Sequence, residues 1–204
     1  MFRTTKHQSD WWARRKIDWR QAYQSTVDHP HRMLISAILR SVPFVSLWEV
    51  GVGGGANLVR IVKDMKGKQL GGSDVSEEAI ALCRETFNNG LFHVEPGNNL
   101  LMSDKSVDVI LTDMCLIYAD PLQIDSYLKE FKRVARSYVV LCEFHSKSWW
   151  KRQVARLGGY HVYDYQKRLE KLGYFNIQVQ HIPTELWPGT DKNTEFRSII
   201  TARI

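Results

Sequence analysis

The chain has 204 residues, of which 44% are hydrophobic and 25% are charged. This length suits one domain with one core, and the apolar content is too high for a disordered chain. No apolar run approaches the roughly 20 residues that a membrane-spanning helix requires, and no secretory signal is visible. The three cysteines, Cys83, Cys115 and Cys142, are widely spaced and indicate neither a disulfide framework nor a cysteine-only zinc site. We therefore expect a cytoplasmic protein without a membrane partner.

The net charge of +6 is concentrated in two segments of the chain. Residues 1–32 contain seven Lys/Arg and three Asp, and residues 145–172 contain seven Lys/Arg and two acidic residues. Both segments also contain tryptophans, namely Trp11, Trp12, Trp19, Trp149 and Trp150. Basic segments with aromatic side chains are typical of nucleic-acid binding, but solvated helices whose aromatics point into the core have the same composition. We favour the second interpretation and keep the first open.

The first 43 residues are predicted to be helical. One helix is expected over residues 10–27, and a second is expected to begin at Pro30, since proline suits the first helical turn. Three polar residues stand at the start of this second helix: His29, His31 and Arg32. They are candidates either for closing over a site or for capping the helix locally.

From residue 44 onward, strands and helices alternate. Strands are expected at residues 44–50, up to 75, at 91–94, 107–112, 138–142, 176–182 and 198–204. Helices are expected after the glycine run at 51–55, from Ser76, after Asp120 and over 161–172. The last two strands have no helix between them and should pair antiparallel. This order predicts a doubly wound α/β sheet with an antiparallel edge.

The most informative segment is Glu-Val-Gly-Val-Gly-Gly-Gly-Ala at residues 49–56, between a predicted strand and a predicted helix. Glycines there permit a tight turn and a close approach of a ligand to the backbone. Gly51, Gly53 and Ala56 satisfy the pattern G-x-G-x-x-[GA]. Asp74 follows Gly51 by 23 residues, near the spacing of an acid that binds ribose hydroxyls. The segment therefore predicts a nucleoside site, as found in nicotinamide dehydrogenases and in methyltransferases.

Three features favour a methyltransferase. Glu49 lies two residues before the first glycine, where a carboxylate repels a diphosphate but suits the amino group of a methionine moiety. About 43 residues of helical sequence precede the first strand, and no sequence remains for a separate substrate domain. An NAD(P)-dependent oxidoreductase is the less favoured alternative.

Segments 49–56, 72–76, 106–113 and 133–136 resemble, in order, successive motifs of the class I S-adenosylmethionine-dependent methyltransferases. The resemblance covers about residues 44–204 and implies a single Rossmann-like unit with S-adenosyl-L-methionine as cofactor. It implies a doubly wound, mostly parallel sheet of seven strands with an antiparallel C-terminal edge strand. Residues 1–43 would then form an N-terminal helical cap or lid.

The resemblance also assigns residues to the cofactor. They are Glu49, Gly51, Gly53, Gly55, Asp74, Val75, Asn98, Asn99, Leu100 and Asp113. The first four would line the methionine and ribose, and Asp74 would bind the ribose hydroxyls. Val75 would pack on adenine, and residues 98–100 would meet the adenine edge.

Catalytic candidates follow from the rule that ligand sites lie at the carboxyl ends of parallel strands. Asp113 and Tyr118 follow the fourth strand, and Glu143 and His145 follow the fifth. A carboxylate or histidine within reach of the acceptor assists proton removal, although orientation by itself also supplies much of the rate enhancement. The alternative for the two acids is a helix cap or a satisfied structural group, and for His145 a plain surface position.

The acceptor is the least defined part of the prediction. Residues 112–115, Thr-Asp-Met-Cys, differ from the Asn-Pro-Pro-Tyr of DNA aminomethyltransferases and lack the proline of cytosine-5 RNA enzymes. We therefore interpret Cys115 as a small buried residue. The favoured function is methyl transfer to a small molecule, with the N-terminal helices and residues 145–160 as a lid. A nucleic-acid acceptor is the alternative, and no metal site is expected.

Overall fold

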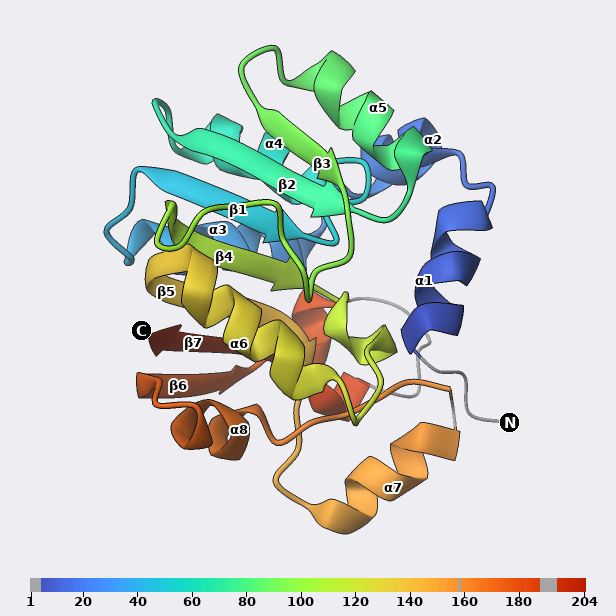
Figure 1. Ribbon diagram of the computed structural model, residues 1–204, viewed down its shortest axis with the longest axis vertical. Coiled ribbons are helices and arrows are strands. Elements are labelled where there is room, and N and C mark those ends of the chain that lie inside the picture. Colours follow the sequence, from blue (N-terminus) through green and yellow to red (C-terminus); the bar gives the residue numbers. More distant parts are fainter. Residues whose placement is uncertain (1–4, 158, 188–193) are drawn as a thin grey trace.

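The computed structural model describes residues 5–157, 159–187 and 194–204. Its centre is a seven-stranded sheet in the order β3-β2-β1-β4-β5-β7-β6, with helices on both faces (Figure 1). The strands are β1 Ser46–Val50, β2 Gln69–Asp74, β3 Leu91–Val94, β4 Val107–Asp113, β5 Ala135–Phe144, β6 Phe175–His181 and β7 Arg197–Arg203. The predicted seven-stranded α/β sheet is thus confirmed.

The C-terminal strands occupy positions that differ in one respect from the prediction. β7 is antiparallel to β5, as expected, but it lies inside the sheet, and β6 forms the edge. The antiparallel C-terminal edge that the sequence predicts is present as the β6–β7 pair, with β6 outermost. The residues explain the order, because β7 is buried along most of its length, whereas β6 alternates polar and apolar side chains and is largely exposed.

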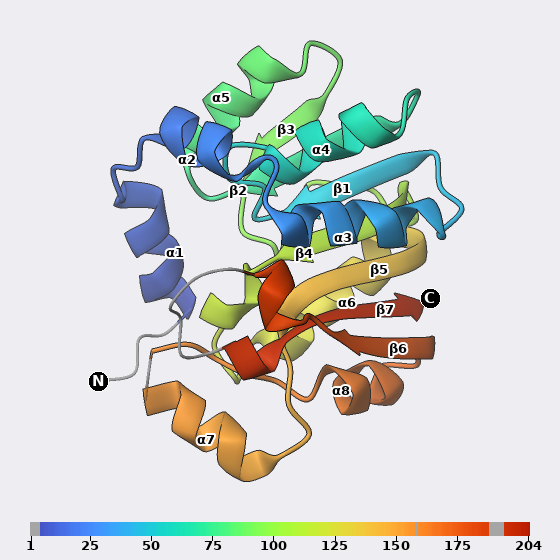
Figure 2. The same ribbon diagram turned by 180° about the vertical axis from the view of Figure 1, so that it is seen from behind.

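The helices are α1 Thr5–Arg14, α2 Trp19–Thr26, α3 Pro30–Arg40, α4 Ala56–Asp64, α5 Glu77–Thr86, α6 Ile124–Val134, α7 Trp149–Leu157 and α8 Tyr165–Lys171. The 3-10 turns are η1 Leu116–Tyr118, η2 Thr184–Leu186 and η3 Thr194–Phe196. Helices α3 and α4 cover one face of the sheet, and α6 and α8 cover the other (Figure 2). None of the helices in the described residues is long and apolar enough to cross a membrane.

The sequence predicts a single helix at residues 10–27, and the structure divides it into α1 and α2. The break occurs because Asp18 begins a new helix, with its Oδ1 accepting a hydrogen bond from the amide of Gln21 at 2.9 Å. Similarly, Asp120 does not start α6 directly but holds a turn through its Oδ1 and the amide of Leu122. The expected cap at Ser76 is confirmed, since its Oγ accepts from the amide of Ala79.

Candidate active site

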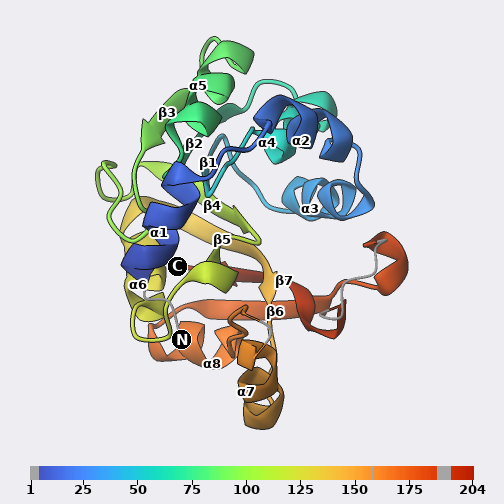
Figure 3. The same cartoon turned by 90° about the vertical axis from the view of Figure 1, so that its right-hand side faces the viewer.

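A cavity of about 320 Å³ lies at the carboxyl ends of β1, β2 and β4. Its walls come from the glycine loop after β1, the end of β2, the segments after β3 and β4, and helices α1 and α2. The lining residues are Ser9, Trp12, Trp19, Val50, Gly51, Gly53, Asp74, Val75, Glu95, Pro96, Gly97, Asp113, Met114, Cys115, Tyr118, Ala119 and Tyr127. Figure 3 shows α1 crossing in front of these strand ends. The cavity is therefore roofed by the N-terminal segment.

The glycine loop forms the floor because its backbone takes conformations that favour glycine. Gly51 and Gly53 have φ values of +73° and +51°, and a Cβ on Gly51 would lie 2.5 Å from the Sγ of Cys115. The amide of Gly53 donates to Asp74 Oδ2 at 2.9 Å, and the amide of Ser76 donates to Asp74 Oδ1 at 3.0 Å. Asp74 thus fixes the loop against the end of β2 while its side chain lines the cavity.

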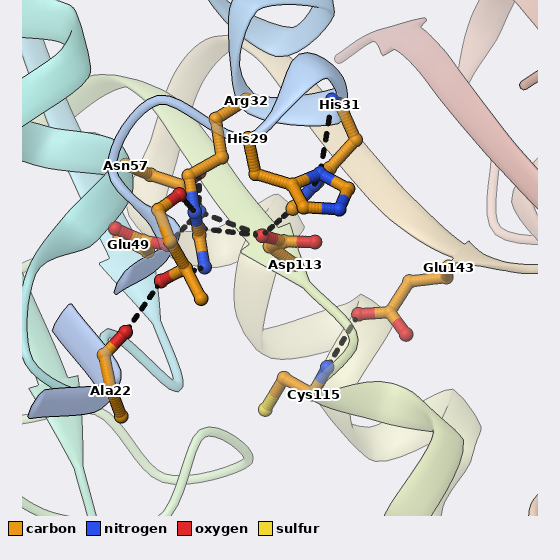
Figure 4. A network of polar contacts seen from close by, with 10 residues as sticks. Ala22, His29, His31, Arg32, Glu49, Asn57, Asp113, Cys115 and Glu143 are labelled. Atoms are coloured by element: carbon orange, nitrogen blue, oxygen red, sulfur yellow. Dashed lines mark hydrogen bonds and ion pairs between the residues drawn. The ribbon is translucent and has the colours of Figure 1, made fainter. Parts of the chain in front are cut away.

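Behind the floor lies a buried polar network centred on Asp113 (Figure 4). Asp113 Oδ2 accepts hydrogen bonds from His31 Nε2 at 3.0 Å, Arg32 Nη1 at 2.9 Å and Asn57 Nδ2 at 3.0 Å. Asn57 Nδ2 also donates to Glu49 Oε1 at 2.6 Å. The network therefore joins the N-termini of α3 and α4 to the ends of β1 and β4.

The pKa values of the two carboxyl groups in this network are shifted in opposite directions. Burial would raise the pKa of Asp113, but His31 and Arg32 outweigh it and hold that pKa below its usual range. Burial raises the pKa of Glu49 to about 8, with Asn57 opposing the shift and Asp113 adding to it. Asp113 is thus ionised at neutral pH, which makes it a poor proton acceptor, whereas burial favours the protonated form of Glu49, a preference that a neighbouring ammonium group would reverse.

Glu143 and His145 do not line the cavity themselves. Glu143 is fully buried, and its Oε1 accepts from the amides of Cys115 and Leu116, each at 3.0 Å. Burial raises the pKa of Glu143 to about 8. His145 Nδ1 accepts from the amide of Tyr165 at 3.2 Å, and burial lowers its pKa. Glu143 is thus a hydrogen-bonded buried acid, as in its structural alternative, whereas His145 is half-buried against the start of α8 and is not a plain surface histidine.

The predicted cofactor residues divide into two groups. Those that line the cavity are Gly51, Gly53, Asp74, Val75 and Asp113, and of the catalytic candidates Asp113 and Tyr118 do so. Glu49 is linked to Asp113 through Asn57, and its Oε2 is buried with no partner in the described part of the chain. Gly55 does not line the cavity, and a Cβ there would lie 2.9 Å from Phe87.

The segment after β3 meets the cavity earlier than predicted. Glu95, Pro96 and Gly97 line it, whereas Asn98, Asn99 and Leu100 do not. The physical reason is a clamp from α6, because the amide of Leu100 donates to Glu130 Oε1 at 2.7 Å and its carbonyl accepts from Arg133. This clamp turns residues 98–100 toward α6.

The sequence predicts an N-terminal lid but does not indicate which aromatic side chains form the roof of the cavity. Trp12 and Trp19 line the cavity, and Trp12 packs edge-on against Tyr118 with ring centroids 5.0 Å apart. The signal available in the sequence was the tryptophan content of residues 1–32, which we interpreted as helices whose aromatic side chains point into the core. Cys115 also lines the cavity, and burial raises the pKa of its thiol well above the usual value, which disfavours a thiolate nucleophile.

The second part of the predicted lid differs in the structure. No described residue of 145–160 lines the cavity; residues 149–157 form α7, and Tyr160 packs behind Tyr118 with ring centroids 5.9 Å apart. His29 caps α3, accepting from the amide of His31, so it acts in local capping, while His31 and Arg32 reach Asp113.

The arrangement fits an adenosyl amino acid. Asp74 and Val75 line one wall of the cavity beside the glycine loop, and an ionised Asp113 lines another. The partnerless Oε2 of Glu49 offers a further acceptor for an ammonium group. In the residues that the structure describes, no group of three or more His, Cys, Asp or Glu side chains is placed to hold a metal ion.

Comparisons with known proteins agree with this geometry. Residues 48–137, from β1 to the start of β5, match a family model described as a methyltransferase domain. A search of curated protein sequences finds no significant match.

Several solved structures share the fold at low sequence identity. Magnesium protoporphyrin IX methyltransferase from Synechocystis PCC 6803 with bound SAH has a TM-score of 0.67 and 15% identity, and the alignment covers 98% of each chain. A SAM-dependent methyltransferase from Archaeoglobus fulgidus has a TM-score of 0.60 and 19% identity over 85% of this chain and 94% of that one. Another from Aquifex aeolicus has a TM-score of 0.62 and 18% identity over 93% and 100%. Residues 48–137 thus match a methyltransferase domain, and the chain shares its seven-stranded fold with S-adenosylmethionine-dependent methyltransferases.

Proposed function

We propose that the protein transfers a methyl group from S-adenosylmethionine to a small-molecule acceptor that enters the cavity beside α1. The observation that carries this proposal is the roof, since Trp12 and Trp19 cover the cavity and narrow the approach left for an acceptor once the cofactor is bound. A covered approach suits a small molecule better than a polymer. The Synechocystis relative in fold, whose named substrate is magnesium protoporphyrin IX, supports the small-molecule class.

The cofactor, when bound, supplies an electrophilic methyl group on a sulfonium. Asp74 would bind the ribose hydroxyls and Val75 would pack on the adenine ring, because both line the wall next to the glycine loop. Asp113 and Glu49 would hold the amino group. The permanent charge of Asp113 supports this assignment, since a carboxylate fixed by Arg32 and His31 is ionised before a cation arrives.

For the transfer step, the protein orients the acceptor and excludes water from it. Trp12, Met114 and Tyr118 present an apolar wall that orients the acceptor. The low pKa of Asp113 disfavours it as a general base, so we assign catalysis to alignment of the acceptor with the methyl group. Glu143 acts as a positioning residue, because it fixes the two amides that begin the turn bearing Tyr118, and His145 positions the start of α8.

The cofactor assignment is tested by calorimetric titration with S-adenosylhomocysteine. The wild-type protein should bind it and ignore NADH. Asp74→Ala should weaken binding by about 1–3 kcal/mol, since it removes the paired ribose contact. Asp104→Ala is the matched control, because Asp104 is exposed and lies outside the cavity lining. Unchanged affinity in folded Asp74→Ala would refute the ribose assignment.

The acceptor class is tested by mass spectrometry of products formed from a panel of small amines, phenols and carboxylic acids, beside unmodified RNA. A methylated small molecule is the expected result. A methylated RNA with no small-molecule product would favour the alternative, in which the exposed Trp149 and Trp150 of α7 contact nucleic acid. We favour the small molecule because α7 does not line the cavity.

A further inference from the structure

Helix α7 presents its apolar side chains to the outside. Trp150, Val154 and Leu157 are 72%, 64% and 83% exposed, and their i, i+4, i+7 spacing places them on one face of the helix. Trp149, at 56% exposed, stands beside them with its ring 4.9 Å from that of Trp150. Of the nine residues of α7, only Ala155 is buried. An amphipathic helix usually packs its apolar face against the core, whereas α7 exposes its apolar face to solvent.

The surroundings of this apolar stripe are basic. Residues 145–163 contain four Lys/Arg and no Asp or Glu. Lys147 and Lys151 are exposed next to Trp150, and Arg152 donates to the carbonyls of residues 146 and 147 just before the helix. Lys151 of this helix forms an ion pair with Glu195. Outside residues 1–32 and 145–172 the chain contains 14 basic and 17 acidic residues, so the positive charge here is local.

The position of α7 makes the stripe accessible. In Figures 1 and 3, α7 stands at one end of the molecule, outside the two helical layers that cover the sheet. A protruding helix can meet a flat surface without any change in the rest of the fold.

We infer that α7 docks the protein onto an anionic lipid surface, with Trp150, Val154 and Leu157 entering the headgroup boundary and Lys147 and Lys151 contacting the acidic headgroups. Tryptophan, aliphatic residues and flanking lysines are the composition of interfacial helices. This is contact with one leaflet and requires no membrane-spanning segment. It revises the expectation from the sequence that the protein has no membrane partner.

Two other occupants fit the stripe less well. A stable protein interface buries about 800 Å² on each partner, and four side chains on a helix of nine residues offer less than this. Single-stranded nucleic acid stacks on aromatic rings and contacts basic groups, but it makes no use of exposed Val154 and Leu157. An anionic lipid surface can contact the tryptophans, the aliphatic residues and the lysines at the same time.

The test uses the full chain with vesicles of phosphatidylcholine, with and without phosphatidylglycerol, read by co-sedimentation and tryptophan emission. Wild-type protein should bind the phosphatidylglycerol vesicles, with emission shifted to shorter wavelength, and the binding should weaken with salt. Leu157→Ser should reduce partitioning about tenfold. Leu122→Ser is the matched control, since Leu122 is 93% exposed but lies outside α7. Both substitutions are at the surface, and equal circular dichroism spectra confirm that the variants fold.

Failure to bind either vesicle, or equal losses in Leu157→Ser and Leu122→Ser, would overturn the proposal. So would RNA binding that Trp150→Ser abolishes, or self-association in sedimentation that Leu157→Ser relieves. The readout does not depend on the cofactor, so a protein that binds S-adenosylhomocysteine but not vesicles refutes this inference and leaves the proposed methyl transfer standing.

Discussion

The floor and the roof of the cavity are built by different means. The floor is the loop at Gly51 and Gly53, fixed to β2 by hydrogen bonds from backbone amides to Asp74. The roof is α1 and α2, held by packing of Trp12 on Tyr118 and Trp19 on Gly53. The floor depends on the backbone conformation of residues close together in the sequence. The roof depends on contacts between side chains that are far apart in the sequence. The two should therefore respond differently to substitution.

The largest effect is expected at Arg32, the buried anchor of the roof. Its Nε donates to the carbonyl of Thr26 at the end of α2, and its Nη1 contacts Asn57 and Asp113. Arg32→Ala leaves Asp113 buried without its guanidinium partner, so we expect a loss of about 3–5 kcal/mol in unfolding free energy, measured with urea. The control is Arg20→Ala, whose partner Glu85 is exposed, with an expected loss below about 1 kcal/mol. Equal losses of unfolding free energy in the two variants would show that Arg32 does not anchor the roof.

The floor is tested by two glycines of nearly identical backbone conformation. Gly51 and Gly67 have φ values of +73° and +75°, but only at Gly51 would a Cβ meet other atoms, namely the side chain of Cys115. Both alanine substitutions should cost about 1 kcal/mol through backbone strain. Gly51→Ala should cost a further 1–3 kcal/mol, roughly, from overpacking, and should weaken S-adenosylhomocysteine binding. Similar unfolding midpoints and affinities for the two variants would contradict the close approach of Cys115.

This comparison explains how far the sequence predicts the structure. The strand, glycine turn, helix and Asp74 were predictable because each depends on residues close in sequence. A helical cap from residues 1–43 was also predicted, but its contacts were not, since nothing local indicates that Trp12 meets Tyr118, although Asp18 is a recognisable start for α2. Residues 98–100 were placed at the cavity because the motif order suggested it, and contacts with Glu130 and Arg133 of α6 turn them away.

Glu143 links the two regions, because it fixes the turn that carries Tyr118 toward the roof. Its pKa is raised to about 8 in the fold against an ordinary value of 4.5, so the folded chain keeps a proton that the unfolded chain loses above about pH 4.5. Its contribution to stability is therefore complete below that pH and lost as pH rises through 8. We expect Glu143→Gln, which cannot ionise in either state, to lose about 3 kcal/mol less stability than wild type between about pH 5 and pH 8.

The measurement is urea unfolding of both proteins at several pH values. Glu49 has a shift of the same sign and is present in both, so the difference between the two proteins isolates Glu143. Parallel pH profiles would show that Glu143 is already ionised in the fold.

The smallest effect concerns the roof alone and compares two adjacent tryptophans of α1. Trp12 lines the cavity and packs on Tyr118, whereas Trp11 lies outside the lining and is 36% exposed. Trp12→Leu removes an aromatic contact of about 0.5–1.5 kcal/mol, so S-adenosylhomocysteine should dissociate up to about tenfold faster in stopped-flow measurements. Trp11→Leu should leave the dissociation rate unchanged. If both variants release the ligand at the wild-type rate, α1 does not close over the bound cofactor, and the roof serves only the acceptor.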